Sequence, residues 1–177
     1  MKFFSFAPVL AAVAFGAMSV VAQGAASIVN GIEQVTTLSA TARDETNSIT
    51  ITTASTEFPQ LLNTANEIVN TISSLGQAIQ AQEGQPLGDN DAQLVVTALK
   101  TFVTVHQEFL NALIGKHSLA AQFFFTGQIA AFLRGLESVV DAFADALIDV
   151  IPTQAPAANA QFSSLSSTLD VAITTYN

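Results

Sequence analysis

The amino-acid sequence predicts an all-α protein, built as an up-and-down bundle of about five amphipathic helices. Apolar residues recur at spacings of three and four over most of the chain, which places them on one side of a helix. Half of the 177 residues are hydrophobic and 11% are charged, a composition that favours one large core over disorder. Short connections join the helical stretches, and helices joined in this way pack as antiparallel neighbours.

The N-terminus has the three parts of a secretory signal peptide. Met1 and Lys2 precede an apolar run from Phe3 to Val21, and small residues end this run at Ala22. We therefore assign 1–22 to a signal peptide and 23–177 to a single helical-bundle domain, with a retained membrane anchor as the alternative. No later segment has the ~20 uninterrupted apolar residues of a transmembrane helix. We expect a secreted, extracellular protein that is either released or held in a cell wall.

The first helix of this domain is expected over about 30–50. Asn30 followed by Glu33 resembles a capping box, and apolar residues follow at helical spacing. Residues 43–51 are polar and rich in β-branched side chains, so their helix propensity is poor. A strand is the alternative for this stretch.

The second helix is expected to begin near Pro59, because proline is tolerated in the first turn of a helix. A clean apolar stripe follows and ends near Ala81. Residues 82–89 combine glycine, proline and aspartate, which favour a loop. Asn90, with Gln93 three residues later, is then predicted to cap the third helix.

The third helix, Asp91–Ile114, carries a broad apolar stripe and is predicted to be the element around which the others pack. At ~1.5 Å per residue it would be about 36 Å long, and so wide a stripe must be covered on more than one side. Gly115 is expected to end or bend this helix. Residues 116–125 include three consecutive phenylalanines and are too apolar for a free linker, so they predict more helix or a tight corner.

The fourth helix is expected from Ile129 to the stop at Pro152, and the fifth from Pro156 to Tyr176. Carboxylates recur every four residues on the polar side of the fourth helix, as Glu137, Asp141, Asp145 and Asp149. Side chains so spaced share a face and could hold a cation, but calcium takes six or more oxygens and no second acidic helix supplies them. We interpret the ladder as a solvated face and predict no metal site.

Charge and composition exclude several functions. The formal net charge of −9 would repel a phosphate backbone, so nucleic acid is not expected as a partner. The chain has no cysteine, which excludes thiol nucleophiles, cysteine-based zinc sites and disulfides. No Gly-x-Ser-x-Gly elbow, glycine-rich phosphate loop or His-Glu-x-x-His motif is present. We predict no catalytic residues and no cofactor, and an enzyme is not expected.

The apolar stripes provide a candidate binding wall. Apolar side chains at helical spacing are most often a packed core, and periodicity alone favours that interpretation. A bundle that encloses a cavity for an acyl chain, or that turns its stripes outward, is the alternative. The residues of the candidate wall are Leu99, Phe102, Val103, Phe109, Leu113, Phe132, Leu136, Val140, Phe143, Phe162, Leu165 and Leu169.

Two polar residues of the third helix are candidate ligand contacts. His106 lies inside the apolar stripe, where a hydrogen-bonded core histidine is the simpler interpretation. The alternative is a polar group at the wall of an apolar pocket, placed to meet a ligand carboxylate. Lys116, at the far end of the helix, could meet the same group from the rim. His117 lies eleven residues beyond His106, too far along the axis for the two rings to share a metal ion.

Three local strings resemble a known family. They are Phe58-Pro59 before the second helix, Phe109–Lys116 at the end of the third, and Asp141–Ile148 with the Ile151-Pro152 that follows. Together with the order of helices, they make 28–176 similar to the fungal hydrophobic surface-binding protein A and cell-wall galactomannoprotein family. The resemblance implies a secreted helical domain that adsorbs to hydrophobic surfaces or binds fatty acids and related lipids. Some relatives carry a Ser/Thr-rich tail and a lipid-anchor signal, which this chain lacks, so release into the medium is expected.

Three hypotheses follow. The first is a secreted, non-enzymatic protein that binds fatty-acid-like lipids or hydrophobic surfaces, driven by apolar burial at about 25 cal/mol per Å². The second is a structural cell-wall mannoprotein whose core is simply packed. The third is a helical bundle that inhibits or recruits secreted hydrolases. Periodicity does not distinguish a cavity from a core.

Overall fold

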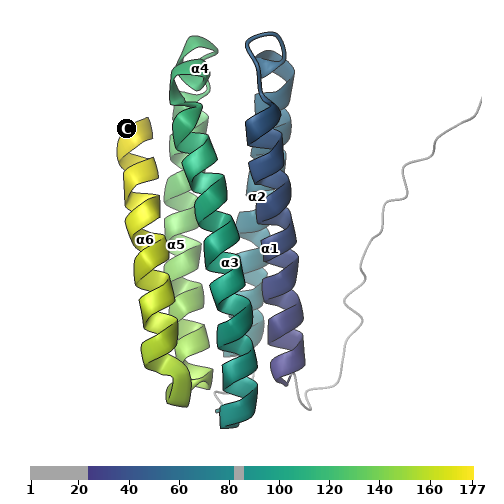
Figure 1. The fold of residues 1–177 in the computed structure, drawn as a ribbon, viewed down its shortest axis with the longest axis vertical. Coiled ribbons are helices and arrows are strands. Elements are labelled where there is room, and N and C mark those ends of the chain that lie inside the picture. The colour runs from purple at the N-terminus through teal and green to yellow at the C-terminus, as the bar shows by residue number, and fades with distance from the viewer. Residues whose placement is uncertain (1–23, 82–85) are drawn as a thin grey trace, which may run out of the picture.

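The computed structural model describes residues 24–81 and 86–177, and these are helical almost throughout (Figure 1). The long helices are α1 (Ala25–Ser48), α2 (Ala54–Gln80), α3 (Asp89–Gly115), α5 (Thr126–Val150) and α6 (Ala155–Tyr176). A short helix, α4 (His117–Gln122), follows α3, and a 3₁₀ turn, η1 (Pro152–Gln154), precedes α6. The predicted all-α bundle is confirmed, with α4 as a sixth α-helix in the segment that was expected to be helix or corner. The predicted signal peptide lies outside the described residues.

The five long helices form a closed ring. α1 packs against α2 and α3, α2 packs against α5, and α6 closes the ring against α5 and α3. Successive long helices alternate in direction, so that α1, α3 and α6 run upward in Figure 1 while α2 and α5 run downward. The expectation that consecutive helices are neighbours is wrong for α2 and α3, which lie on either side of α1. α3 is one member of the ring and not its centre.

The predicted capping boxes are wrong. α1 starts after Gly24 and α3 after Gly88, and neither start has a side-chain cap. Asn30 and Asn90 therefore lie within the helices. Gly88 is exposed and Gly24 is partly exposed, so water can satisfy the free amides of the first turns and no side-chain cap is required.

α2 begins at Ala54, so Pro59 lies in its second turn and not in its first. Ala54 and Phe58 are both completely buried, and this packing holds the turn before the proline in the helix. The carbonyl that Pro59 cannot bond is that of Ser55, which is exposed to water. Tertiary burial thus places the start of α2 earlier than proline statistics suggest.

The polar end of α1 is helical and not a strand. Ala42, Thr46 and Ile49 are buried at spacings of four and three, so one face of this stretch belongs to the core. The Thr46 hydroxyl donates a hydrogen bond of 2.6 Å to the Ala42 carbonyl, which satisfies the buried polar group within the helix. Packing therefore overrides the poor intrinsic propensity of the sequence.

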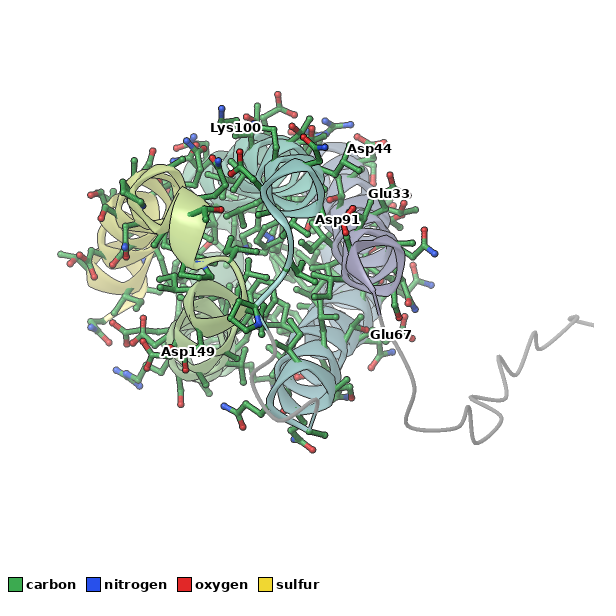
Figure 2. All side chains as sticks on the ribbon, turned by 90° about the horizontal axis from the view of Figure 1, so that it is seen from below. Glu33, Asp44, Glu67, Asp91, Lys100 and Asp149 are labelled. Carbon is green, nitrogen blue, oxygen red and sulfur yellow. The ribbon has the colours of Figure 1, made fainter. Side chains whose placement is uncertain are left out.

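The interior of the ring is filled with side chains. Figure 2 looks along the bundle and shows the labelled charged residues on its outside: Glu33, Asp44, Glu67, Asp91, Lys100 and Asp149.

In the acidic ladder, Asp141, Asp145 and Asp149 are exposed and Glu137 is half-buried. The described residues hold no group of three or more acidic or histidine side chains placed to bind a metal ion. None of the described helices is both long and apolar enough to span a membrane.

Candidate functional site

A groove of about 540 Å³ runs between α1 and α2 near their lower ends in Figure 1. Its floor is apolar and is formed by Ile28, Gly31, Leu75, Ala78 and Ile79. Its rim is polar, with Ser27, Asn30, Gln34, Asn70, Thr71 and Ser74. An apolar floor with a polar rim, and a volume within the ~300 to 1,000 Å³ typical of small-molecule sites, suits an amphiphilic ligand.

The floor of the groove depends on one glycine. A Cβ atom added at Gly31 would lie 2.6 Å from Cδ1 of Leu75, closer than two carbon atoms approach. The absence of a side chain on α1 therefore allows Leu75 of α2 to lie against the helix backbone. Glycine inside a predicted helix often marks such an approach. This sequence signal could have pointed to the groove, which our sequence reasoning missed.

A second, interior gap lies behind the groove. It is lined by Ile32, Val35, Ile72, Leu75, Phe102 and Phe143, and it is too small to hold a water molecule. Leu75 lines both the groove and the gap, and its side chain is half-buried. Leu75 therefore lies between the solvent-facing groove and the centre of the bundle.

The predicted wall residues lie in the core. All twelve are at most 7% exposed, and they come from α3, α5 and α6. Among them, Phe102 and Phe143 line the interior gap, whereas none lines the groove. The structure therefore brings two of the predicted residues to a candidate site, and contact of the other ten with a ligand stays a prediction.

His106 is a completely buried polar residue at the seam between α1 and α3. Its Nδ1 lies 2.8 Å from the hydroxyl oxygen of Ser39, and its ring contacts the rings of Phe102 and Phe109 at centroid distances of 5.2 and 5.6 Å. Burial lowers the pKa of His106 to about 3, so the ring is neutral at neutral pH. Its Nε2 is buried without a hydrogen-bond partner in the described structure, a state that costs about 1 to 3 kcal/mol.

Lys116 lies at the other end of α3. Its Nζ donates to the carbonyl oxygens of Asn47 and Ile49 at 3.2 and 2.7 Å. These carbonyls lie at the C-terminus of α1, where a positive charge is favourable. Lys116 thus stabilises the end of a neighbouring helix, and its contact with a ligand stays a prediction.

A second surface lies at the opposite end of the bundle, where the α1–α2 turn and α4 lie in Figure 1. Ile51 is 65% exposed in this turn, and Phe124, just after α4, is 90% exposed. Phe124 has a φ of 64°, a left-handed backbone conformation that is rare for a bulky residue. The segments 49–56 and 116–129, which carry these two residues, contain no aspartate and no glutamate. We call Ile51 and Phe124 the apolar tip.

The fold places this chain in a class of helical-bundle proteins with known structures. Afmp4p in complex with palmitic acid has a TM-score of 0.81 at 18% identity, covering 86% of this chain and 99% of that one. Ligand binding domain 1 of the Penicillium marneffei MP1 protein, complexed with arachidonic acids, has a TM-score of 0.72 at 16% identity, covering 85% and 99%. Domain 2 of the same protein, with multiple arachidonic acids, has a TM-score of 0.72 at 15% identity, covering 85% and 92%.

The family is shown by the sequence itself. The family model described as hydrophobic surface binding protein A matches residues 25–149, which include α1 to α4, α5 except Val150, and every residue that lines the groove and the interior gap. The chain belongs to the hydrophobic surface binding protein A family. The resemblance seen in the sequence is thereby confirmed. No curated protein sequence matches the chain.

Proposed function

We propose that this protein is a secreted, non-enzymatic carrier of fatty acids or similar single-chain lipids, with the α1–α2 groove as the entrance to its site. The groove carries this proposal, because Leu75 lines both its apolar floor and the interior gap. Outward movement of this side chain would join groove and gap into one apolar channel. Each Å² of apolar surface buried there would contribute about 25 cal/mol.

The comparisons support this choice of ligand. Afmp4p is described with palmitic acid, and both MP1 domains are described with arachidonic acids. All of these molecules combine a long apolar chain with one small polar head. The proposed carrier would hold the same kind of ligand, with its chain in the groove and the gap.

Native mass spectrometry with palmitic acid tests the proposal. We expect a one-to-one complex for the whole protein, and its loss or at least tenfold weakening in Ser74→Trp, which would fill the groove. Ser166→Trp is the matched control, because it places the same exposed residue on α6, away from α1 and α2. Equal binding by both variants would show that the groove is not the entrance.

Adsorption to hydrophobic surfaces is a second candidate function, favoured by the apolar tip. A phenylalanine that is 90% exposed in a left-handed conformation has no role in the core, and the segments 49–56 and 116–129 that carry the apolar tip have no acidic residues. Such an end suits contact with an uncharged apolar surface. We expect Phe124→Ser to reduce adsorption to an alkyl-coated quartz crystal. Leu94→Ser, which removes a 59% exposed leucine near the start of α3, should leave adsorption unchanged.

A further inference from the structure

We propose that Nε2 of His106 accepts a hydrogen bond from the polar head of the ligand, so that the head must be a hydrogen donor. A protonated carboxyl or a hydroxyl group meets this requirement, and an ester does not. The inference rests on the proposed function, because it concerns the lipid that enters through the groove. It specifies the chemical class of the ligand's head. It also predicts that a fatty acid takes up one proton when it binds.

The hydrogen bonds of Ser39 determine which ring nitrogen carries the hydrogen. Its Oγ lies 2.8 Å from the carbonyl oxygen of Val35 and 2.8 Å from Nδ1 of His106. The carbonyl oxygen only accepts, so the single hydroxyl hydrogen of Ser39 is used in that bond. Both bonds form together only when Nδ1 carries the ring hydrogen and donates it to Ser39. In the neutral ring, Nε2 is then a lone-pair acceptor.

The position of the ring suits a ligand head. Val35 on α1 and Phe102 on α3 line the interior gap, and Ser39 and His106 follow them by four residues, one helical turn further along. α1 and α3 run in the same direction, so both steps lead the same way along the bundle (Figure 1). The leading end of a lipid that extends from the groove through the gap in this direction would therefore reach His106, and a polar leading end would find the unpartnered Nε2 there.

No ion pair or hydrogen bond with a charged group is formed by His106 in the described structure. Burial is the cause of the lowered pKa of His106, without a contribution from a charged neighbour. On the outer side of the same seam, Arg43 of α1 bonds Glu108 of α3 at 2.5 Å, and both are accessible to solvent. Glu45 on α1 is half-buried and accepts a hydrogen bond from the Thr64 hydroxyl of α2, while its Oε2 is buried without a partner. The other charged groups of the surrounding helices are exposed or half-exposed: Asp44 on α1, Glu67 on α2, Glu137 and Asp141 on α5, and Asp170 on α6.

A donor head couples binding to proton uptake. A fatty acid is a carboxylate in water near neutral pH, because carboxyl groups have a pKa of about 4. Binding would take one proton from solvent, which ends on the carboxyl oxygen, so that the carboxyl O–H donates to Nε2. The complex gains one proton, and nothing is oxidised or reduced. A fatty alcohol brings its own hydrogen and would bind without proton uptake.

Calorimetric titration of the whole protein with dodecanoic acid, dodecanol and methyl dodecanoate tests the inference. We expect the acid to bind with uptake of about one proton, measured in buffers of different ionisation heat, and about 100-fold more weakly at pH 7.5 than at pH 5.5. The alcohol should bind equally at both pH values, and about tenfold more tightly than the ester. In His106→Phe, checked for helicity, the alcohol and the ester should bind alike.

The outcomes separate the inference from the proposed function. Equal affinities for the three ligands, or binding of the acid without proton uptake, would overturn the role of His106 and leave the lipid carrier standing. Binding of none of the three would overturn the carrier itself. The proton count needs no variant, so the inference stays testable if His106→Phe does not fold.

Discussion

The two sides of the ring are built differently. α3, α5 and α6 meet through aromatic rings, as in the T-shaped contact of Phe143 with Phe162 at 5.8 Å and the contact of Phe109 with Phe132 at 6.2 Å. α1 has no aromatic residue, and it turns Gly31 toward Leu75 of α2. The first side is a packed core, whereas the α1–α2 side leaves a groove outside and a gap behind it.

This difference indicates which side opens. Aromatic side chains bury on the order of 150 to 250 Å² each, so separating α3 from α5 and α6 exposes much apolar surface. Separating α1 from α2 exposes smaller side chains, and Leu75 is already half-buried. The free-energy cost of opening the bundle should therefore be lowest between α1 and α2. The variants below test this comparison, from the largest expected effect to the smallest.

Phe109→Ala should have the largest effect. Phe109 is completely buried and contacts both Phe132 and His106, so its loss leaves a cavity and should lower the free energy of unfolding by about 3 to 5 kcal/mol. Leu75→Ala on the groove side should cost less than half as much, because its side chain is half-buried. Urea denaturation measures both. Equal losses would show that the two sides are packed alike.

Acidification should weaken the seam that joins the two sides. His106 has a folded-state pKa of about 3, below the ~6.5 of an unfolded chain, so the unfolded chain binds the proton first as the pH falls. Its contribution to stability is fully present above pH 6.5 and is lost by about 1.4 kcal/mol per pH unit as the pH falls toward 3. Denaturation at pH 6.5 and pH 5 should therefore differ by about 2 kcal/mol more in the wild type than in His106→Phe. An equal difference would mean that His106 is not buried as a neutral ring.

Lys116→Met should have a moderate effect on stability and none on the site. It removes two hydrogen bonds to the end of α1, with an expected loss of about 1 to 2 kcal/mol. The affinity for palmitic acid should stay the same, because Nζ is occupied at the end remote from the groove. A weaker complex with unchanged stability would instead support Lys116 as a ligand contact.

Gly31→Ala should change the free energy of unfolding least, although it changes the shape of the groove by displacing Leu75. Alanine favours the helix by up to about 1 kcal/mol, but its Cβ forces Leu75 to move, so the two terms should nearly cancel. Gly135→Ala is the control, since nothing lies within 4 Å of the added Cβ, and it should stabilise α5 by about 0.5 to 1 kcal/mol. If both changes stabilise equally, then Gly31 does not hold Leu75 in place.

Much of the fold could be predicted from the sequence, because helical periodicity records which side of each helix is buried. The buried face of α3, from Val95 to Leu113, matches its apolar stripe. Helix starts could not be predicted in the same way, because the burial of Ala54 and Phe58, and not the position of Pro59, determines where α2 begins. Periodicity also does not record which helices are neighbours, so it did not place α1 between α2 and α3.

The candidate site was predicted less well. His106 was recognised as a polar residue in an apolar stripe, but its partner Ser39 lies 67 residues away and no local pattern joins them. The groove depends on the close approach of Leu75 to the backbone at Gly31, which only the packing of α1 on α2 reveals. The apolar stripes predict which residues form the core. They do not predict the proposed entrance, which lies in the groove between α1 and α2.

The central claim is that a fatty acid enters between α1 and α2. Methyl NMR spectra of the protein with and without palmitic acid test it directly, since isoleucine, leucine and valine methyl groups lie on both sides of the ring. The account predicts that the methyl signals of Ile28, Leu75 and Ile79 change on binding, while those of Leu165 and Leu169 on α6 stay in place. Changes confined to the α6 methyl groups, with Leu75 unaffected, would contradict it.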